Sequence, residues 1–309
     1  MTGERVCITG ISGFVGQHLA SYLAAGGYEV SGVSRNSKYD SNIISWCDLW
    51  KSDLNYHTII HAAGKAHDLK NTSDEKEYFT INTELTRRIY DAFLASDSAK
   101  VFIYMSSVKA VADTVSGELI EEHPPKPVGP YGKSKLAAEN YIKNQNVPEG
   151  KFVYIIRPCM IYGPSAKGNL KLLYKMVSKG IPYPLAAFTN KRSFVSVENL
   201  CFVIEKLIRQ KPISFGIYNI SDDEAVSTTE IIKLMQITIN KRVYTVRIPK
   251  MIIKGMARVG DICRLPLNTD RLQKLTENYV VSNQKIKRTL GIQLPVSTRE
   301  GLQKTFITY

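Results

Sequence analysis

The sequence predicts an α/β fold in which a doubly wound parallel sheet is followed by a smaller C-terminal lobe. Short apolar runs alternate with helical stripes through the first half of the chain, which is the order of βαβ units. These runs lack the polar–apolar alternation of a strand that has one solvent-exposed face, so we expect helices on both sides of the sheet. After residue 220 the pattern becomes mixed and more basic.

The expected elements follow from these patterns in chain order. Val15, Leu19 and Leu23 recur at helical spacing directly after the first strand. Strands are expected at residues 5–9, 29–33, 58–61, 101–105, 152–156, 193–197 and 215–220, and further helices at 84–94, 131–143 and 170–177. We expect a large domain from residues 1–163, to which 191–220 return, and a smaller lobe from 164–190 and 221–309.

The composition limits the partners of the chain. It has 309 residues, a formal charge of +13 and five widely spaced cysteines without a Cys-x-x-Cys motif. The basic residues are spread out, and no zinc-ligand or RNA-binding signature accompanies them. A phosphorylated small ligand explains part of the charge, so we expect no nucleic-acid partner and no metal. The cysteines indicate reduced, mostly buried thiols and a cytoplasmic location.

One stretch is both basic and apolar. No run approaches the ~20 residues of a membrane span, and the N-terminus enters a strand pattern at once, so no signal peptide is expected. Residues 248–259 combine Lys and Arg with Ile, Met and Val, a composition that suits a membrane surface. A packed C-terminal helix explains them as well. We expect the packed helix and no membrane partner.

The turn after the first strand has the spacing of a dinucleotide loop. In "TGISGFVG", Gly10, Gly13 and Gly16 stand between a strand and a helix, the context in which backbone N–H groups hold a pyrophosphate. We therefore expect residues 1–163 to be a Rossmann-type NAD(P)-binding domain. Phe14 and Val15, inside this motif, are counted among the cofactor-binding residues.

The end of the second strand bears on the choice of cofactor. An acidic side chain there would bind a ribose 2′-hydroxyl and select NAD. The chain has Ser34 followed by Arg35, a small residue and a cation that suit a 2′-phosphate. We expect NADP in preference to NAD. The alternative is that Arg35 is a solvated surface residue.

The stretch "GPYGKSKLAAE" places Tyr131 and Lys135 four residues apart at the start of a helix. Residues at i and i+4 lie on one helix face, so a phenol would stand beside an ammonium. A nearby positive charge favours phenolate and makes tyrosine a better acid/base. An ordinary surface pair is the alternative.

Further motifs fall in a fixed order along the chain. They are "HAAG" (61–64), Asn82 in "INTELT", "MSS" (105–107), "YGKSK" (131–135), "RPCMIYGP" (157–164) and "RSFVSVENL" (192–200). With the glycine loop, this ordered set resembles the extended short-chain dehydrogenases/reductases, in the NAD-dependent epimerase/dehydratase branch. The likeness covers nearly two-thirds of the chain and is loose beyond it.

The resemblance implies roles for particular residues. The residue matching Tyr131 is the general acid/base, Lys135 holds the nicotinamide ribose and lowers the tyrosine's pKa, and Ser107 donates a hydrogen bond to the substrate. Asn82 would brace the sheet. The remaining residues implied for the cofactor are Asp48 and Leu49 at the adenine, Ala62, Ala63 and Gly64 at the pyrophosphate and ribose, and Pro158 at the nicotinamide.

The resemblance also narrows the reaction. Dehydratases of this branch carry Thr-Asp-Glu where this chain has Ser107-Val108-Lys109, which disfavours sugar 4,6-dehydration. Hydride transfer at a sugar carbinol carbon remains, either in a 4-keto reductase or in a 4-epimerase, and the two stand nearly level.

The implied substrate is a nucleotide sugar of the UDP-hexose or 4-keto-6-deoxyhexosamine type, used in polysaccharide precursor synthesis. Asn169 would touch the diphosphate–sugar region and Arg192 would pair with a phosphate, unless Arg192 forms a structural ion pair. Lys65 and His67 either border the sugar or face solvent. A homodimer through the helices of Tyr131 and Glu84 is expected. A non-catalytic dinucleotide-binding regulator is the alternative of another class.

Overall fold

A seven-stranded parallel sheet forms the centre of the molecule. The computed structural model describes residues 3–34, 43–44, 46, 55–65, 74–166, 168–263 and 268–309, and all statements concern these residues. The strands, in chain order, are β1 (Arg5–Thr9), β2 (Glu29–Val33), β3 (Ile43–Ile44), β4 (Thr58–His61), β5 (Val101–Met105), β7 (Phe152–Pro158) and β10 (Phe215–Ile220). Their order in space is β10-β7-β5-β4-β1-β2-β3, and every pair is parallel.

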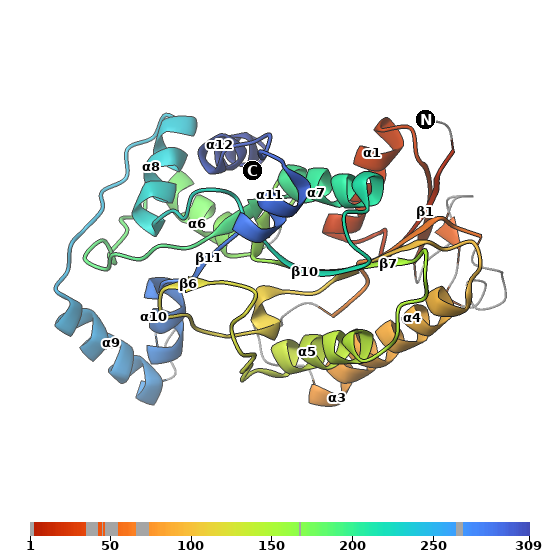
Figure 1. Cartoon of the computed structure of the whole chain (residues 1–309). Helices are drawn as coiled ribbons and strands as arrows, with labels where there is room; N and C mark the ends of the chain where they lie inside the picture. Colours follow the sequence, from red (N-terminus) through yellow and green to blue (C-terminus); the bar gives the residue numbers. More distant parts are fainter. Residues whose placement is uncertain are drawn as a thin grey trace.

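Helices cover both faces of this sheet, as Figure 1 shows. On one face lie α1 (Phe14–Ala25) and α7 (Val197–Gln210), and on the other lie α4 (Leu85–Ala95) and α5 (Pro130–Lys143). The chain winds outward from β1 to β3 and then returns to β4 to continue the other way. The expected doubly wound α/β fold is confirmed.

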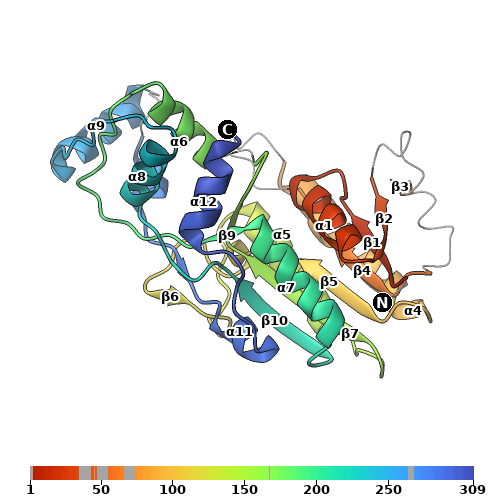
Figure 2. The ribbon, with the colours of Figure 1, turned by 90° about the horizontal axis from the view of Figure 1, so that it is seen from above.

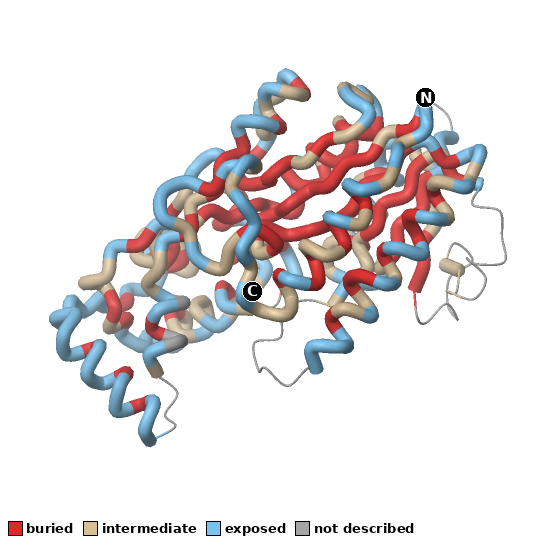
Figure 3. Tube along the Cα trace, turned by 60° about the horizontal axis from the view of Figure 1, so that its bottom comes forward, coloured by how far each residue is buried: buried red, intermediate tan, exposed pale blue. Residues whose placement is uncertain are grey.

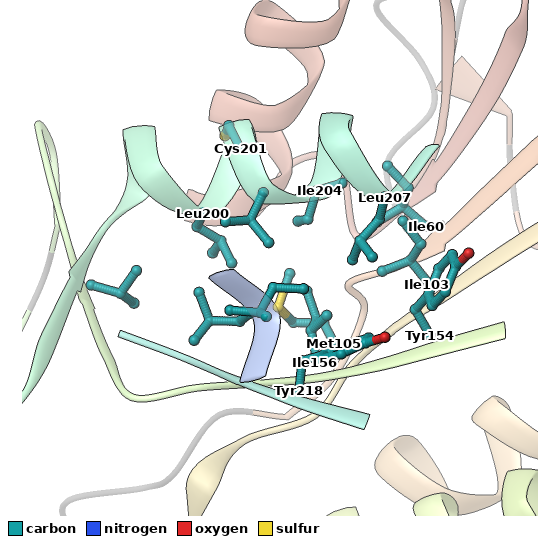
Figure 4. Close-up of a cluster of buried hydrophobic side chains, with 14 of the residues drawn as sticks. Ile60, Ile103, Met105, Tyr154, Ile156, Leu200, Cys201, Ile204, Leu207 and Tyr218 are labelled. Carbon is teal, nitrogen blue, oxygen red and sulfur yellow. The ribbon is translucent and has the colours of Figure 1, made fainter. Parts of the chain in front are cut away.

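Each central strand contributes to two hydrophobic cores. In β5, Ile103 points into the core under α7, while Phe102 points into the core under α4 and α5. Figure 4 shows the first core, where Leu200, Ile204 and Leu207 of α7 contact residues from the sheet. A strand buried on both faces needs apolar residues at successive positions, which explains the unbroken apolar runs of the sequence.

The C-terminal part forms a third core beside the sheet (Figure 2). Its helices are α6 (Asn169–Ser178), α8 (Thr228–Thr238), α9 (Lys250–Cys263), α10 (Thr269–Thr276) and α12 (Thr298–Ile307). Two small sheets join distant segments: β8 (Met160–Tyr162) pairs with β9 (Phe194–Ser196), and β6 (Glu118–Leu119) with β11 (Val280–Val281). Helix α11 (Gln284–Leu290) packs near β10. The division into two lobes stays a prediction.

Two predicted helices differ from those observed. The helix expected at 84–94 starts at Leu85, after α3 (Glu75–Phe79), which Asp74 caps, and a π-helical turn at Thr80–Glu84. The helix expected near 248–259 is α9, but it is packed along one edge only. Ile253, Ala257 and Gly260 are its buried residues, and most of α9 is exposed (Figure 3).

Candidate active site

The glycine loop follows β1 at the point where the strand order reverses. Gly10 has a φ of +73°, and a Cβ added to it would lie 2.8 Å from the backbone of Ala63. A Cβ on Gly16 would lie 2.3 Å from the carbonyl oxygen of Gly10. Only glycine therefore fits at these two positions. The start of α1 is brought close to the ends of β1 and β4, with its first N–H groups available to an anion.

A cavity of about 590 Å³ adjoins this loop, and we call it the glycine-loop cavity. Of the predicted cofactor residues, Gly10, Gly13, Ser34, Ala62, Ala63 and Gly64 line it. The hydroxyl of Ser34 lies 3.0 Å from that of Ser12. Trp46, Ile81, Leu85 and Arg88 also line the cavity, and sequence reasoning did not identify them. Trp46 and Arg88 lie outside the quoted motifs, and in "INTELT" only Asn82 was assigned a role.

Not every predicted cofactor residue reaches this cavity. Phe14 lines neither cavity and packs edge-on against His18, with ring centroids 5.1 Å apart. Gly16 is buried in the helix–loop contact. Arg35, Asp48 and Leu49 lie outside the described residues, as does His67.

A second cavity of about 410 Å³ lies beside the first, and we call it the tyrosine cavity. Ser107, Tyr131 and Lys135 line it, together with Val15, Pro158 and Asn169 from the predicted set. Ala62, Gly64 and Lys65 line both cavities, so the two adjoin at the end of β4. Met105, Cys159, Met160 and Ile161 complete an apolar part of the wall.

Tyr131 stands in the first turn of α5, where Gly129 is the N-cap and Pro130 is the first helical residue. Ser107, at the end of β5, shares a hydrogen bond with the Tyr131 side chain. Burial raises the pKa of Tyr131, and the hydrogen bond with Ser107 opposes this rise.

Lys135 lies one helical turn further on and is buried. Its Nζ donates a hydrogen bond to the carbonyl oxygen of Met105 at 2.8 Å and lies 4.9 Å from the ring centre of Tyr104. Burial lowers its pKa to about 8, while the charge of Glu139 opposes this fall. We expected Lys135 to lower the pKa of Tyr131. Here the net direction for the pKa of Tyr131 is upward, because the effect of burial outweighs that of the hydrogen bond with Ser107.

A buried ion pair connects α5 to β7. Arg157 of β7 donates from Nη2 to Oε2 of Glu139 at 2.6 Å and from Nε to Oε1 at 3.0 Å. Ser106 donates to the same Oε1 at 2.5 Å. Glu139 follows Lys135 by one turn, and Arg157 precedes Pro158. The pair therefore ties α5 to the strand end that lines the cavity.

A chain of buried hydrogen bonds connects the glycine loop to the π-helical turn. Thr86 donates to the carbonyl oxygen of Asn82, so it accepts from Nε2 of His61 at 2.9 Å. Nδ1 of His61 is then an acceptor, and Thr9 donates to it at 2.7 Å. Thr9 in turn accepts from the N–H of Ala63. Burial lowers the pKa of His61 to about 3, so the ring is neutral and carries its proton on Nε2.

Asn82 braces the loop after β4. Its side-chain oxygen accepts from the N–H of Lys65 at 2.7 Å, and its Nδ2 donates to the carbonyl oxygen of Lys65 and to Ser134 of α5. This agrees with the structural role expected of it. Lys65 itself forms an ion pair with Glu77 at 2.7 Å on the wall of the glycine-loop cavity.

The residues expected at the substrate end are not all brought together. Asn169, the first residue of α6, lines the tyrosine cavity. Arg192 lines neither cavity and lies 3.6 Å from Glu277 in an ion pair, which is the alternative stated for it. Its role at a phosphate stays a prediction. Val108 is buried, and the Nζ of Lys109 donates to the carbonyl oxygen of Asp113, so neither side chain offers an acid to the cavity.

The described residues offer neither a metal site nor a membrane-spanning helix. They contain no group of three or more His, Cys, Asp or Glu that could hold a metal ion. Within the same ranges no helix is both long and apolar enough to cross a bilayer. The cytoplasmic location and the homodimer stay predictions.

Comparisons with known proteins agree on a family. The model of the NAD dependent epimerase/dehydratase family matches residues 6–221. A UDP-glucose 4-epimerase of Vibrio cholerae is 31% identical and covers 98% of this chain and 96% of its own. An N-acetyl-alpha-D-glucosaminyl-diphospho-ditrans,octacis-undecaprenol 4-epimerase of Escherichia coli O157:H7 is 25% identical, covering 98% and 94%. A GDP-6-deoxy-D-mannose reductase of Pseudomonas aeruginosa is 27% identical, covering 75% and 79%.

Solved structures agree on the fold. MoeE5 in complex with UDP-glucose and NAD has a TM-score of 0.76 at 20% identity and covers 98% of both chains. RMD from Pseudomonas aeruginosa complexed with NADPH has a TM-score of 0.74 at 21% identity, covering 99% of this chain and 98% of its own. The family predicted from the ordered motifs is confirmed, and its relatives are epimerases and reductases, as expected.

Proposed function

Because the chain belongs to the NAD dependent epimerase/dehydratase family, we propose that it is a nucleotide-sugar 4-epimerase that uses a nicotinamide dinucleotide. One observation carries the proposal: Ser107, Tyr131 and Lys135 converge on a cavity that adjoins the glycine-loop cavity through Ala62 and Gly64. The sequence left epimerase and reductase nearly level. Two relatives that match almost the whole chain favour the epimerase, since each is a 4-epimerase.

The shape of the glycine-loop cavity fits the cofactor. Side chains are excluded at Gly10, where a Cβ would meet Ala63, and small residues at 62–64 let a large anion approach the backbone. When bound, a nicotinamide dinucleotide supplies the hydride acceptor for the sugar carbinol carbon and the donor that returns the hydride to the other face. Lys135, whose Nζ lies 3.1 Å from a Cβ position built on Gly64, would hold the ribose there.

Proton transfer falls to Tyr131. In the proposed reaction its phenolate oxygen takes the proton of the sugar hydroxyl, and Ser107 donates a hydrogen bond to the substrate oxygen. The same phenol returns the proton when the hydroxyl re-forms, so protons and electrons balance over the cycle. Burial raises the pKa of Tyr131 and so opposes formation of the phenolate that the first step needs, whereas the positive charge of Lys135 would favour it.

Replacement of Tyr131 tests this assignment. We expect Tyr131→Phe to lower kcat for interconversion of UDP-glucose and UDP-galactose by about 10³-fold, the usual size of an acid/base contribution, with cofactor content unchanged. Tyr141→Phe is the matched control, since Tyr141 lies on the same helix, is solvent-accessible and binds Asp91 instead. Equal activities of the two variants would refute the role of Tyr131.

The second candidate is a 4-keto sugar reductase that consumes NADPH. Ser34 favours it, because this residue at the end of β2 is small and its hydroxyl faces Ser12, so its side chain supplies no carboxylate for a ribose 2′-hydroxyl. Mass spectrometry of the nucleotide released on denaturation separates the candidates. About one NAD per chain supports the epimerase, which recycles its cofactor. Empty protein that binds NADPH more tightly than NADH supports the reductase.

A further inference from the structure

Helix α9 exposes a row of large apolar side chains to solvent. Met251 and Ile262 are 86% and 84% exposed, and Ile252, Met256 and Val259 are each more than half exposed. At 100° per residue these five positions occupy one continuous face of the helix, which we call the α9 stripe. Ile253 and Ala257, on the opposite side, attach the helix to the third core.

Positive charge follows one edge of this stripe. Lys250, Lys254 and Arg258 recur at i, i+4 and i+8 and are all exposed, and we call them the basic row. The segment 241–263 contains six basic residues and one acidic residue, Asp261. The carboxylate of Asp261 accepts hydrogen bonds from the backbone and the hydroxyl of Thr269, so it is engaged within the lobe.

The position of α9 makes the stripe accessible. Figures 1 and 2 show the helix at one end of the molecule, on the opposite side from β1 and α4. The α9 stripe contributes no residue to the glycine-loop cavity or the tyrosine cavity. Its five side chains are exposed to solvent, so a partner surface can reach them.

We propose that the α9 stripe docks this protein on an anionic lipid bilayer, with the apolar side chains entering the headgroup region and the basic row facing acidic lipids. An amphipathic helix with basic residues beside an apolar face is the arrangement that binds such interfaces. The formal charge of +13 adds attraction at longer range. This departs from the absence of a membrane partner expected from the sequence.

Charge complementarity favours lipid over a second copy of the chain. A twofold pair needs a self-complementary surface, so the basic row would have to meet carboxylates of the same helix. Asp261 is the one acidic residue that α9 carries, and Thr269 engages it. A surface of acidic lipid headgroups complements the row without this constraint.

Vesicle sedimentation of the full chain tests the proposal. We expect the protein to bind vesicles of phosphatidylcholine that contain about 30% phosphatidylglycerol, and to bind vesicles of phosphatidylcholine alone much more weakly. High salt should abolish this difference. The variant Met251→Gln/Ile262→Gln should bind anionic vesicles at least tenfold more weakly, since two exposed apolar anchors are removed. Lys250→Gln/Lys254→Gln should weaken binding by about fivefold per charge.

A matched control separates docking through the α9 stripe from nonspecific hydrophobic binding. Ile307, on α12, is 76% exposed and lies outside the stripe, so Ile307→Gln should bind like the wild type. Glutamine is a good helix former, and circular dichroism checks that each variant is folded. Equal binding of the wild type and Met251→Gln/Ile262→Gln overturns the proposal. The proposal is also overturned if sedimentation velocity shows that the wild type is a dimer and that this variant is a monomer, and if vesicles bind neither protein. A second copy of the chain would then cover the stripe.

Discussion

Two buried carboxylates in this chain are satisfied in different ways. Glu139, beneath the tyrosine cavity, is held by the full charge of Arg157 and by Ser106. Asp222, just beyond β10, accepts only from neutral groups: the Tyr162 hydroxyl, the Asn199 amide and the Ser196 backbone N–H. Burial raises the pKa of Asp222 to about 6, although these donors oppose the rise.

The difference separates a fixed contact from a titratable one. The Glu139–Arg157 pair carries its own counter-charge, so it can hold α5 against β7 at any pH near neutrality. The Asp222 cluster joins β8, β9 and α7, and Asn199 extends it to the carbonyl oxygen of Val296. No cation is among the groups that contact this carboxylate, so the stabilisation that the cluster provides should change with pH.

The largest expected effect comes from breaking the charged pair. Arg157→Met leaves Glu139 buried with one hydroxyl donor, and we expect a loss of about 3–5 kcal/mol in the free energy of unfolding. Glu139→Leu/Arg157→Met should recover about 2 kcal/mol of this loss, because neither member of the ion pair is then left buried without the other. Urea denaturation measures both, and a double variant no more stable than the single one would contradict this account.

The Asp222 cluster should make stability depend on pH. The folded pKa of about 6 exceeds the ordinary value of 3.8, so the folded state binds the proton more tightly. Ionisation of Asp222 therefore costs stability as pH rises from about 4 to 6, by at most about 3 kcal/mol, and protonation restores it as pH falls.

The variant Asp222→Asn isolates the contribution of the Asp222 charge to the pH dependence of stability. The amide can accept from Asn199 and Ser196 and donate to the Tyr162 hydroxyl, which also lies 3.2 Å from the carbonyl oxygen of Thr298. Relative to the wild type, the variant should gain about 2 kcal/mol between pH 4.5 and pH 7. Parallel unfolding free energies of the two proteins over this range would show that Asp222 keeps an ordinary pKa.

A smaller effect is expected from one neutral donor. Tyr162→Phe removes a hydroxyl that donates to Asp222 at 2.7 Å, and we expect a loss of about 1.5 kcal/mol at pH 7, typical of a hydrogen bond to a charged group. The loss should shrink at pH 4.5, where Asp222 is protonated. An equal loss at both pH values would mean that the hydroxyl acts through packing alone.

Much of the site on the cofactor side was predictable from the sequence. Gly10, Gly13, Ala62–Gly64, Ser107, Tyr131, Lys135 and Pro158 all line one of the two cavities. They could be found because they lie in short sequence motifs: Tyr131 and Lys135 are one turn apart on α5, and the others follow or end strands. The ends of parallel strands meet at one edge of the sheet. Trp46, Arg88 and Glu139 were missed, since nothing local to them indicates where their side chains point. Arg192 was expected at a phosphate and is paired with Glu277.

The sequence by itself determined the alternation of the main strands and helices up to residue 220, the glycine loop and the placement of Tyr131 and Lys135 on one helix face. These depend on residues that are neighbours in the chain, where backbone conformation and helical spacing decide the geometry. The tertiary structure alone decided the partners of Glu139, His61 and Asp222 and the exposure of α9. The contacts of these three side chains join residues from 18 to 60 positions apart, and only the packing of whole elements determines which buried polar groups meet.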